Sequence, residues 1–560
     1  MKARNNVITV LATLTMGVQA LAAGPGEWRS VVAPAPTARA ATAEVAAMHS
    51  ARTSYIVQAP SYAVAANAVK SVGGRITHEL QIINAVAATL NTRQHATLLA
   101  DRRLSLIYNG TAKVAGYAGQ PYVVAQTQAN QLHSSGITGK GVTIAFVDTG
   151  LWPNTPLAKN TAGQTAFLQG YDAINDKVGT AAVNDSNGHG TNVTSIATNS
   201  ALAVDGTYIG MAPDAARVAV EAFGANGSGT YANTIRGLNW ILLNKATYNI
   251  RVVNMSFGAT PQSSYWNDPI NQAVMKLWQA GIVVVASAGN SGPAEQTITV
   301  PGNVPYVITV GAMTDNYTPA NTADDRLASF SSTGPTFEGF VKPEIVAPGG
   351  HVTGIMNKTG TIAHAHPEFH DGDKYFMMSG TSQSAAVVSG VVALMLQAHP
   401  ALTPDQVKCA LMSSARPAVD ATGKLSYTVF QQGAGQINAY DAVYSTNYAC
   451  ANEGLNISAD IAGTQHYGGP AHQDAVTKNF YVVDANGTPI TQQGYLWNKG
   501  YLWNQGYLWS KGYLWNQGYL WSKGYLWNQG YLWSKGYLWN LSFVPSVASA
   551  SGIESWVSQE

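Results

Sequence analysis

Three polar residues stand in an order and in surroundings that could support covalent chemistry. Asp148 follows a run rich in Val and Ile, and His189 lies 41 residues later between two glycines. Ser382 lies a further 193 residues on, within Ser379-Gly380-Thr381-Ser382. A hydroxyl becomes an effective nucleophile when a neighbouring base takes its proton, and a carboxylate can orient that base. Together the three residue types predict acyl transfer through a covalent intermediate.

Each of the three motifs is weak evidence by itself. Asp-Thr-Gly after Val147 is common turn chemistry, and a single histidine is more often structural than catalytic. Ser382 precedes an apolar helical segment, where a serine is often only an N-cap. The same place also provides the positive end of a helix and backbone N–H groups for an oxyanion. The order of all three motifs is therefore more specific than any one of them.

The segments between these motifs predict a parallel sheet covered by helices on both faces. Short runs rich in Val and Ile alternate with helical segments, which is typical of α/β folds with buried strands. Ligands of such sheets bind at the carboxyl ends of the strands, where Asp148 is expected. The runs are residues 142–147, 218–222, 252–255, 282–286 and 307–310.

Residues 116–446 resemble the subtilisin-like serine proteases, the subtilase family (peptidase S8). The resemblance implies a subtilisin-like α/β fold and a secreted serine endopeptidase that is made as a self-processing precursor. Supporting matches lie around each of the three motifs and between them. They include Ile144 to Gly150, Gly188 to Thr191, Asn254 to Gly258, Ala288 to Asn290, Phe330 to Gly334, Lys342 to Gly349 and Gly380 to Ser382.

The resemblance implies a role for each residue of the site. Ser382 would be the nucleophile, His189 the general base and acid, and Asp148 the group that orients the imidazole. Asn290 would donate to the oxyanion together with the backbone N–H of Ser382. The chain departs from the family pattern at Asn192, where a second histidine is usual, and at Ala386, where a proline is usual. Neither residue carries a proton in the mechanism.

Substrate binding follows from the same resemblance. Ser228 and Gly229 on one side, and Ser256, Phe257 and Gly258 on the other, resemble the two edges between which a subtilase pairs its substrate as an added strand. Ala288 and Gly289 would form the second wall of the primary pocket, opposite residues 256–258. Neither wall contains an acidic residue. We therefore expect an apolar or aromatic preference, because Phe257 is a bulky apolar neighbour.

The N-terminal region predicts export and self-inhibition. Residues 1–23 have a basic start, an uncharged stretch and small residues at Ala20, Ala22 and Ala23, as in a secretory signal peptide. Residues 24–52 suit a linker. Residues 53–115 resemble an inhibitory propeptide, and self-cleavage is expected between Tyr108 and Gln131. A small independent α+β domain is the alternative interpretation.

Composition excludes several partners and leaves the metal content open. The chain has 560 residues with a formal net charge of +1, so nothing indicates nucleic-acid binding. Export would permit a disulfide between Cys409 and Cys450, although two unpaired thiols are the alternative. Catalysis is expected to need no cofactor, and a structural calcium ion is left open without an assigned site. The loop with His364, His366, Glu368, His370, Asp371 and Asp373 suggests a cation site or, more simply, a solvated insertion.

The C-terminal region contains an aromatic repeat. Residues 447–493 form an unassigned extension, residues 494–541 repeat Gly-Tyr-Leu-Trp eight times, and residues 542–560 form a tail. A six-residue period is a multiple of the strand period, so it predicts a β-solenoid or sheet with aromatic ladders. Such ladders suit polysaccharide or a cell surface, whereas a low-complexity spacer is the alternative. A surface-binding protein on a protease scaffold is the competing function, but it would be expected to have lost part of the site.

Overall fold

The computed structural model describes most of the chain after residue 51. The signal-peptide prediction, nearly all of the linker and the tail, and the repeat apart from the backbone of two residues, lie outside the described residues. Side chains of residues 111–113, 489–490 and 513–514 are not described. The described residues are 52–109, 111–113, 122–318, 321–322, 324–420, 424–483, 489–490, 513–514 and 557.

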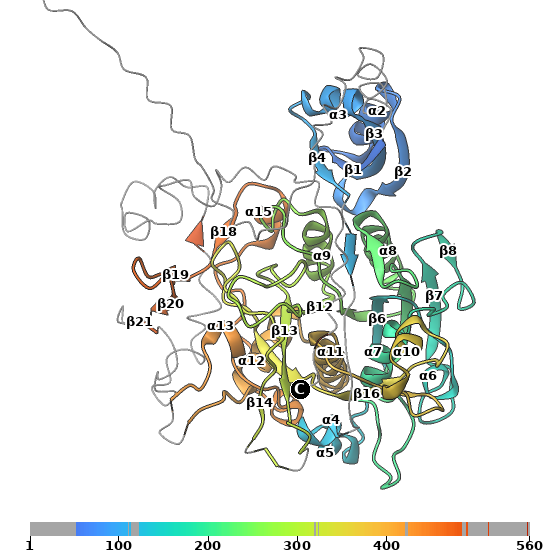
Figure 1. Ribbon diagram of the computed structural model, residues 1–560, viewed down its shortest axis with the longest axis vertical. Helices are drawn as coiled ribbons and strands as arrows, with labels where there is room; N and C mark the ends of the chain where they lie inside the picture. Colours follow the sequence, from blue (N-terminus) through green and yellow to red (C-terminus); the bar gives the residue numbers. More distant parts are fainter. Residues whose placement is uncertain are drawn as a thin grey trace, which may run out of the picture. The chain divides into compact units, whose positions relative to one another are not determined.

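Residues 52–108 form a small antiparallel sheet with two helices, in the place predicted for the propeptide. The strand order is β2-β3-β1-β4, and Figure 1 shows α2 and α3 beside these strands. Ser61 and Asn91 cap the two helices by accepting backbone N–H groups of their first turns. The elements are β1 (Arg52–Gln58), α2 (Tyr62–Ser71), β2 (Arg75–Leu80), η1 (Gln81–Ile83), β3 (Ala85–Asn91), α3 (Thr92–Leu99) and β4 (Ser105–Tyr108).

A nine-stranded sheet forms the centre of the larger part of the chain. Its order is β14-β13-β12-β11-β6-β9-β7-β8, and β15 pairs with β13. The longer strands are parallel, as predicted, but the two-residue strands β8 and β14 are antiparallel, so the sheet is mixed. A short returning loop is enough for an antiparallel edge, whereas a parallel strand needs a crossover. The strands are β6 (Thr143–Asp148), β7 (Phe167–Asp172), β8 (Lys177–Val178), β9 (Ala216–Glu221), β11 (Ile250–Met255), β12 (Val283–Ser287), β13 (Ile308–Thr314), β14 (Arg326–Leu327) and β15 (Ile345–Pro348).

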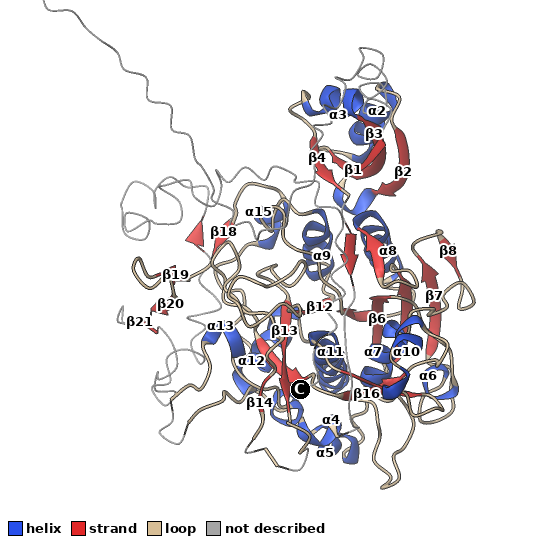
Figure 2. Ribbon diagram, viewed as in Figure 1, coloured by secondary structure: helices blue, strands red, loops and turns tan. Residues whose placement is uncertain are grey.

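Helices cover this sheet, and Figure 2 shows them around the central strands. Every residue of β6, β12, β13 and β15 is buried, as expected for strands covered on both faces. The helix α11 packs against α7 and against strands β11, β12, β13 and β15, while α8 packs against α9. The long helices are α7 (His189–Thr198), α8 (Tyr231–Asn244), α9 (Pro269–Gln279), α11 (Thr381–Ala398) and α12 (Pro404–Ser414).

Shorter elements connect these parts. The helices are α4 (Val123–Gln126), α5 (Ala129–Ser134), α6 (Thr155–Ala158), α10 (Thr361–Ala365), η2 (Pro367–Phe369), α13 (Val429–Gln432), α14 (Ala439–Val443) and α15 (Ile457–Ile461). The strands are β5 (Thr111–Lys113), β10 (Ser228–Thr230), β16 (Val352–Ile355), β17 (Tyr375–Met378), β18 (Tyr467–Gly468), β19 (His472–Gln473), β20 (Phe480–Val483), β21 (Pro489–Ile490) and β22 (Tyr513–Leu514). Because β22 pairs with β18, two backbone residues of the aromatic repeat form an antiparallel strand pair with the extension.

The extension after residue 446 is fastened to the sheet and its helices. A disulfide joins Cys409 of α12 to Cys450, which settles the alternative that the sequence left open. The buried carboxylate of Asp460 accepts hydrogen bonds from the hydroxyls of Tyr265 at 2.6 Å and Tyr306 at 3.0 Å. A buried carboxylate is stable only when such donors replace its water. The extension is therefore held both covalently and by buried polar contacts.

Candidate active site

The carboxylate of Asp148 and the imidazole of His189 form a buried pair. Asp148 is the last residue of β6 and His189 is the first residue of α7. Nδ1 of His189 lies 2.8 Å from Oδ1 of Asp148, and both side chains are at most 1% exposed. The carboxylate keeps a proton on Nδ1, so Nε2 is left as the acceptor. Among the residues that the structure describes, Nε2 has no hydrogen-bond partner.

A second buried carboxylate, Asp185, joins the loop after β6 to the first turn of α7. It accepts the N–H groups of Gly188 and Thr191, both at 2.7 Å, and the hydroxyl of Thr149 at 2.8 Å. Burial raises the pKa of Asp185, while these hydrogen bonds oppose the increase. Our sequence reasoning missed this residue. Its only signal was an aspartate three residues before the glycine that precedes His189.

The start of α7 lies so close to the loop after β6 that position 190 must be glycine. A Cβ at Gly190 would lie 2.3 Å from the carbonyl oxygen of Gly150, which is far inside van der Waals contact. The N–H of Gly190 donates to the hydroxyl of Thr149 at 2.8 Å. The glycine after His189 therefore lets the helix start lie against the loop that carries Asp148.

Ser382 is the second residue of α11, and contacts with the end of β11 position it. Its Oγ donates to the carbonyl oxygen of Ser256 at 3.0 Å, and Oγ of Ser256 donates to the carbonyl oxygen of Ser382 at 2.9 Å. Nε2 of His189 does not accept from Ser382 in this arrangement. Such contacts are often long without substrate, and a rotation of the serine side chain would be needed to form this one.

Helices α7 and α11 are joined beside these residues. Nε2 of Gln383 donates to Oδ1 of Asn192 at 3.2 Å, which brings the residue after Ser382 to the first turn of α7. Asn192 is one of the two departures from the family pattern, and its role here is to connect the two helices. The other departure, Ala386, is completely buried within α11.

The amide of Asn290 is oriented by the helix that carries Ser382. Its Oδ1 accepts the N–H of Thr381 at 2.9 Å and the hydroxyl of Thr381 at 2.8 Å. The N–H of Gly289 donates to the same hydroxyl at 3.2 Å. Because the oxygen end of the amide is held by Thr381, the NH₂ end is the one that could donate to a developing oxyanion. Thr381 is a positioning residue that the sequence did not reveal.

Replacing Asn290 with alanine is expected to lower kcat by about 100- to 1,000-fold, the usual loss for one oxyanion donor, with little change in KM. Steady-state kinetics with a peptide anilide would measure both constants. Thr381→Ser keeps the hydroxyl that holds Asn290 and is the matched control, expected to stay near wild type. A raised KM with unchanged kcat for Asn290→Ala would assign the amide to substrate binding instead.

The predicted substrate edge at Ser228 and Gly229 already pairs with another strand of this chain. They belong to β10, which pairs antiparallel with β5, with Gly229 opposite Ala112 and Ser228 opposite Lys113. A Cβ at Gly229 would lie 2.3 Å from the carbonyl oxygen of Ala222, so this edge strand lies close to the chain behind it. The edge can therefore accept an added strand, as the resemblance implies.

The predicted wall residues follow β11 and β12, but the argument from Phe257 was wrong. The ring of Phe257 is 1% exposed and packs in the core against Phe223, with ring centroids 4.8 Å apart. It therefore offers no surface to a substrate side chain. In the other wall, Ala288 is buried and Gly289 has φ of +108°, a conformation that favours glycine.

The described side chains of the histidine-rich loop do not converge on one point. Nε2 of His370 contacts the carbonyl oxygen of Met356 at 3.0 Å, and Nδ1 of His366 lies 3.6 Å from Glu368. Across the described residues, no three His, Cys, Asp or Glu side chains gather around one point. The simpler interpretation of this loop, a solvated insertion, agrees with the exposure of Glu368 and Asp373.

Known proteins are similar to this chain in sequence and in fold. The sequence model of the subtilase family matches residues 139–436. Serine protease AprX of Bacillus subtilis is 39% identical over 316 residues, which cover 55% of this chain and 67% of that protein. Subtilisin E of the same species is 30% identical over 384 residues, 67% of this chain and 88% of the relative.

A solved structure supports the fold. Fervidolysin from Fervidobacterium pennivorans, described as a keratinolytic enzyme related to subtilisin, superposes with a TM-score of 0.57 at 21% identity. The match covers 72% of this chain and 62% of that one, so this chain spans less than two thirds of fervidolysin. With a matching family over more than half of its length, the chain belongs to the subtilase family and is a serine endopeptidase.

Proposed function

We propose that Asp148, His189 and Ser382 form the catalytic triad with which this endopeptidase hydrolyses proteins. The observation that carries the proposal is the buried hydrogen bond of 2.8 Å between Asp148 and His189, with Nε2 of the imidazole left as an acceptor beside the helix that carries Ser382. Subtilases need no cofactor for catalysis. All steps can therefore be assigned to side chains and backbone groups of this chain.

The mechanism begins when Oγ of Ser382 attacks the peptide carbonyl and its proton passes to Nε2 of His189. Asp148 stabilises the imidazolium, and the NH₂ group of Asn290 and the N–H of Ser382 hold the oxyanion. The C–N bond then breaks as Nε2 returns the proton to the leaving amine. Water, activated by the same imidazole, hydrolyses the acyl-enzyme and restores Ser382.

Covalent labelling tests this assignment directly. Phenylmethylsulfonyl fluoride is expected to modify one residue, to stop casein hydrolysis, and to add its mass to the peptide that contains Ser382. Incubation of the Ser382→Ala variant with the same reagent is the control and should add no label. Loss of activity with the label on another serine would reject the triad, and an unlabelled chain that never digests casein would return attention to the surface-binding alternative.

We also propose that residues 52–113 act as an inhibitory propeptide. Several of its apolar residues, including Ile56, Ile82 and Ile83, join the same hydrophobic core as α8 and α9. Asn109 accepts the N–H of Ala232 at 2.9 Å, in the first turn of α8. The strand β5 then lies on the substrate edge β10. A segment that covers this edge would exclude a protein substrate.

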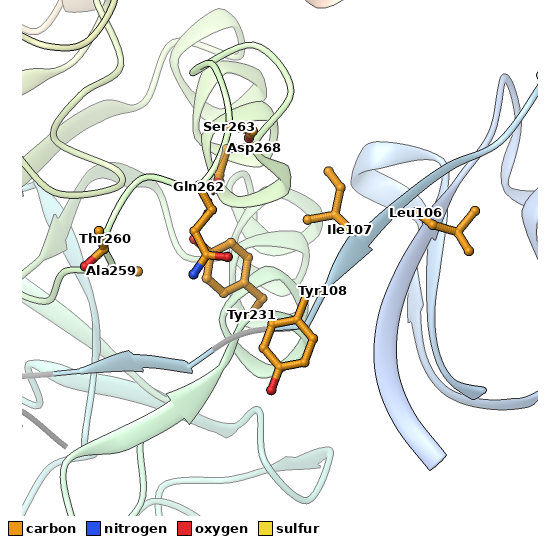
Figure 3. A pocket seen from close by; sticks show the side chains of 9 residues that line it. All are labelled: Leu106, Ile107, Tyr108, Tyr231, Ala259, Thr260, Gln262, Ser263 and Asp268. Carbon is orange, nitrogen blue, oxygen red and sulfur yellow. Dashed lines mark hydrogen bonds between the residues drawn. The ribbon is translucent and has the colours of Figure 1, made fainter. Parts of the chain in front are cut away.

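The strand pairing narrows the proposed cleavage point. Residues 111–113 lie on the substrate edge, and the helix α4 starts at Val123. We infer self-cleavage between Lys113 and Tyr122, inside the wider window that the sequence predicts. A cavity of about 380 Å³ lies beside this junction, between β4 and residues of α8 and of the segment after β11 (Figure 3). Its lining is Leu106, Ile107, Tyr108, Tyr231, Ala259, Thr260, Gln262, Ser263 and Asp268.

Acidification is expected to weaken the bound propeptide through His78. Nε2 of His78 lies 2.7 Å from Oδ1 of Asn233 on α8. Burial, and secondarily the charge of Arg236, lower the pKa of His78 to about 4, against the smaller opposing effects of Asn233 and Asp176. In the free propeptide, the imidazole of His78 becomes protonated below about pH 6.5. Affinity should therefore be constant above pH 6.5 and fall between pH 6.5 and 4.

Gel filtration of the self-cleaved complex at pH 7.5 and pH 5 would measure this change. We expect the dissociation constant to rise about tenfold at pH 5, after allowing for solvent screening of a partly exposed group. His78→Gln keeps a hydrogen-bond donor toward Asn233 but cannot titrate, so its profile should be flatter. Equal pH profiles for the two proteins would show that another group controls release.

We further propose that the enzyme is secreted. The signal-peptide pattern of residues 1–23 and the disulfide between Cys409 and Cys450 both support this proposal, because structural disulfides persist mainly outside the cytosol. Binding of polysaccharide or a cell surface by the repeat stays a prediction. Retention of the full chain on insoluble polysaccharide would test it.

A further inference from the structure

The insertion between β16 and β17, residues 356–374, lies against the loop that leads into α7. Two consecutive backbone N–H groups at the start of α10 donate to two consecutive carbonyl oxygens of this loop. Thr361 donates to Ser186 at 3.0 Å, and Ile362 donates to Asn187 at 3.1 Å. The first N–H groups of a helix have no partner inside the helix and need an acceptor outside it. The loop before α7 provides both acceptors, and Figure 1 shows α10 beside α7.

A second contact comes from the residue that begins the insertion. The side chain of Met356 is completely buried and packs on Gly188, the residue before His189. A Cβ at Gly188 would lie 2.7 Å from Cγ and 2.8 Å from Sδ of Met356, so the two residues are in tight contact. Asp185 holds the same glycine by accepting its N–H at 2.7 Å. The position of Gly188, and with it that of His189, thus depends on both Asp185 and the insertion.

The imidazole of His370 joins the two ends of the insertion. Its Nε2 donates to the carbonyl oxygen of Met356 at 3.0 Å, and its Nδ1 accepts the N–H of Gly372 at 3.0 Å. The side chain is 5% exposed. Oδ1 of Asp371 lies 3.6 Å from Nδ1, but it accepts the three backbone N–H groups of residues 373–375, each at 2.9 Å. The hydrogen bonds of His370 therefore fix the residue that contacts the loop before α7.

The hairpin that carries the insertion also leads to Ser382. Strand β17 ends four residues before this serine. Nδ2 of Asn192, in the first turn of α7, donates to the carbonyl oxygen of Phe376 in β17 at 3.3 Å. The N–H of Ile355 in β16 donates to Oγ of Ser195 on α7 at 2.6 Å. One hairpin thus contacts the helix that begins with His189 and continues into the helix that carries the serine.

We propose that the insertion is a clamp that holds His189 in position relative to Ser382, and that His370 keeps the clamp closed. His370 is a positioning residue here, since it acts through Met356. The inference rests on the proposed triad and adds to it a part that the three motifs do not contain. Placement matters because a displacement of about 1 Å at the reacting atoms can lower the rate about 100-fold. One of the histidines that suggested a cation site thus has a different role.

Replacing His370 with leucine tests the clamp. Leucine is of similar size, but it neither donates to Met356 nor accepts from Gly372. In the mature enzyme we expect kcat for a peptide anilide to fall about tenfold or more. KM should stay within about twofold, because the substrate backbone binds to β10 and residues 256–258. His370→Gln retains a donor toward Met356 and should recover kcat to within about threefold of wild type. His364→Leu is the matched control at an exposed histidine of the same insertion, and both constants should stay unchanged.

A second pair of variants tests the contact with the loop without changing the imidazole. Thr361→Pro removes the N–H that donates to Ser186, and proline is well tolerated at the first position of a helix. Gly360 before it has φ of −63° and ψ of 150°, an extended conformation that suits a residue before proline. We expect a loss of about three- to tenfold in kcat. Thr361→Val keeps this N–H and loses only the hydroxyl bond to Ser186 at 3.2 Å, so it should stay close to wild type.

Thermal unfolding of each variant in the Ser382→Ala background separates placement from folding. The midpoints should stay well above the assay temperature, so that the loss in kcat is not unfolding. Wild-type kcat in both His370→Leu and Thr361→Pro would overturn the clamp while leaving the triad intact, and so would a raised KM with unchanged kcat. If His370→Leu does not fold, Thr361→Pro decides alone. A wild type that hydrolyses no peptide and takes up no sulfonyl label would reject the proposed function, and the clamp with it.

Discussion

Ser382→Ala is expected to lower kcat by about 10⁶-fold, the loss known for the nucleophile in triads of this kind. The alanine has no hydroxyl to attack the peptide carbonyl, while the Asp148–His189 pair and the Asn290 amide remain in place. The residual rate should come from substrate binding and the oxyanion donors alone. The fluorescence of a quenched peptide substrate, followed over days, has the range to measure such a loss.

The triad should also behave as one unit. Adding His189→Ala to Ser382→Ala is expected to cost almost nothing further, because the base has no proton left to accept. Ser384→Ala is the matched control: this buried serine lies two residues along α11 and donates to the carbonyl oxygen of Ala347 at 3.0 Å. Its loss should leave kcat within a few-fold of wild type. A Ser382→Ala protein with more than about 1% activity would show that another residue is the nucleophile.

The same variant tests self-processing. If the propeptide is removed by the enzyme itself, Ser382→Ala should keep residues 52–113 attached, and mass spectrometry should find the uncut chain. Trace wild-type enzyme added to the variant would then cut it between Lys113 and Tyr122. Normal processing of the purified variant alone would contradict self-cleavage.

Glu344→Gln is expected to lower the free energy of unfolding by about 3–5 kcal/mol. Oε1 of Glu344 lies 2.7 Å from Nζ of Lys342 and 2.8 Å from Nζ of Lys408, and all three side chains are 1% exposed. One carboxylate thus faces two ammonium groups in the interior. Burial lowers the pKa of Lys342 to about 7, against the attraction of Glu344. Glutamine would leave these lysines without a counter-charge.

Thermal unfolding would measure this loss, and the measurement belongs in the Ser382→Ala background, where the chain cannot digest itself. A shift of the midpoint by about 5 °C or more is expected. Lys342→Met is the matched control, since it leaves one lysine with one carboxylate and should cost less. A larger loss for Lys342→Met than for Glu344→Gln would mean that packing, not charge, dominates this cluster.

The lowered pKa of Lys342 also makes the stability of the folded chain depend on pH. Its pKa is about 7 in the folded chain and near 10.5 in the unfolded chain, so between these values the unfolded state binds more protons. The contribution of Lys342 to the free energy of unfolding therefore rises between pH 7 and 10.5, and it stays at its lower level below pH 7. The Lys342→Met protein should lack this rise.

Residues whose chemistry is visible in their type were predicted from the sequence, whereas those that act by position were not. Asp148, His189, Ser382 and Asn290 lie in short motifs with defined order, and the structure brings Asp148 and His189 into contact. Their catalytic roles stay predictions until the variants are measured. The parallel strands were predictable as well, because buried strands have continuous apolar runs. The two-residue edge strands β8 and β14 carry too little pattern to detect.

Asp185 and Thr381 could not have been selected in advance. Asp185 acts through backbone N–H groups just before α7 and in its first turn, and such bonds leave no pattern in residue type. Phe257 shows the opposite error: its bulk was visible, but the direction of its side chain depends on the packing of Phe223.

The disulfide between Cys409 and Cys450 affects what happens when one molecule of this protease cleaves another. A cut by a neighbouring molecule anywhere between these residues would divide the chain in two, yet the sulfur bridge would keep both pieces joined. The C-terminal piece would contain Cys450 and the aromatic repeat of residues 494–541. A single cleavage between Cys409 and Cys450 would therefore not release the C-terminal region from the catalytic domain.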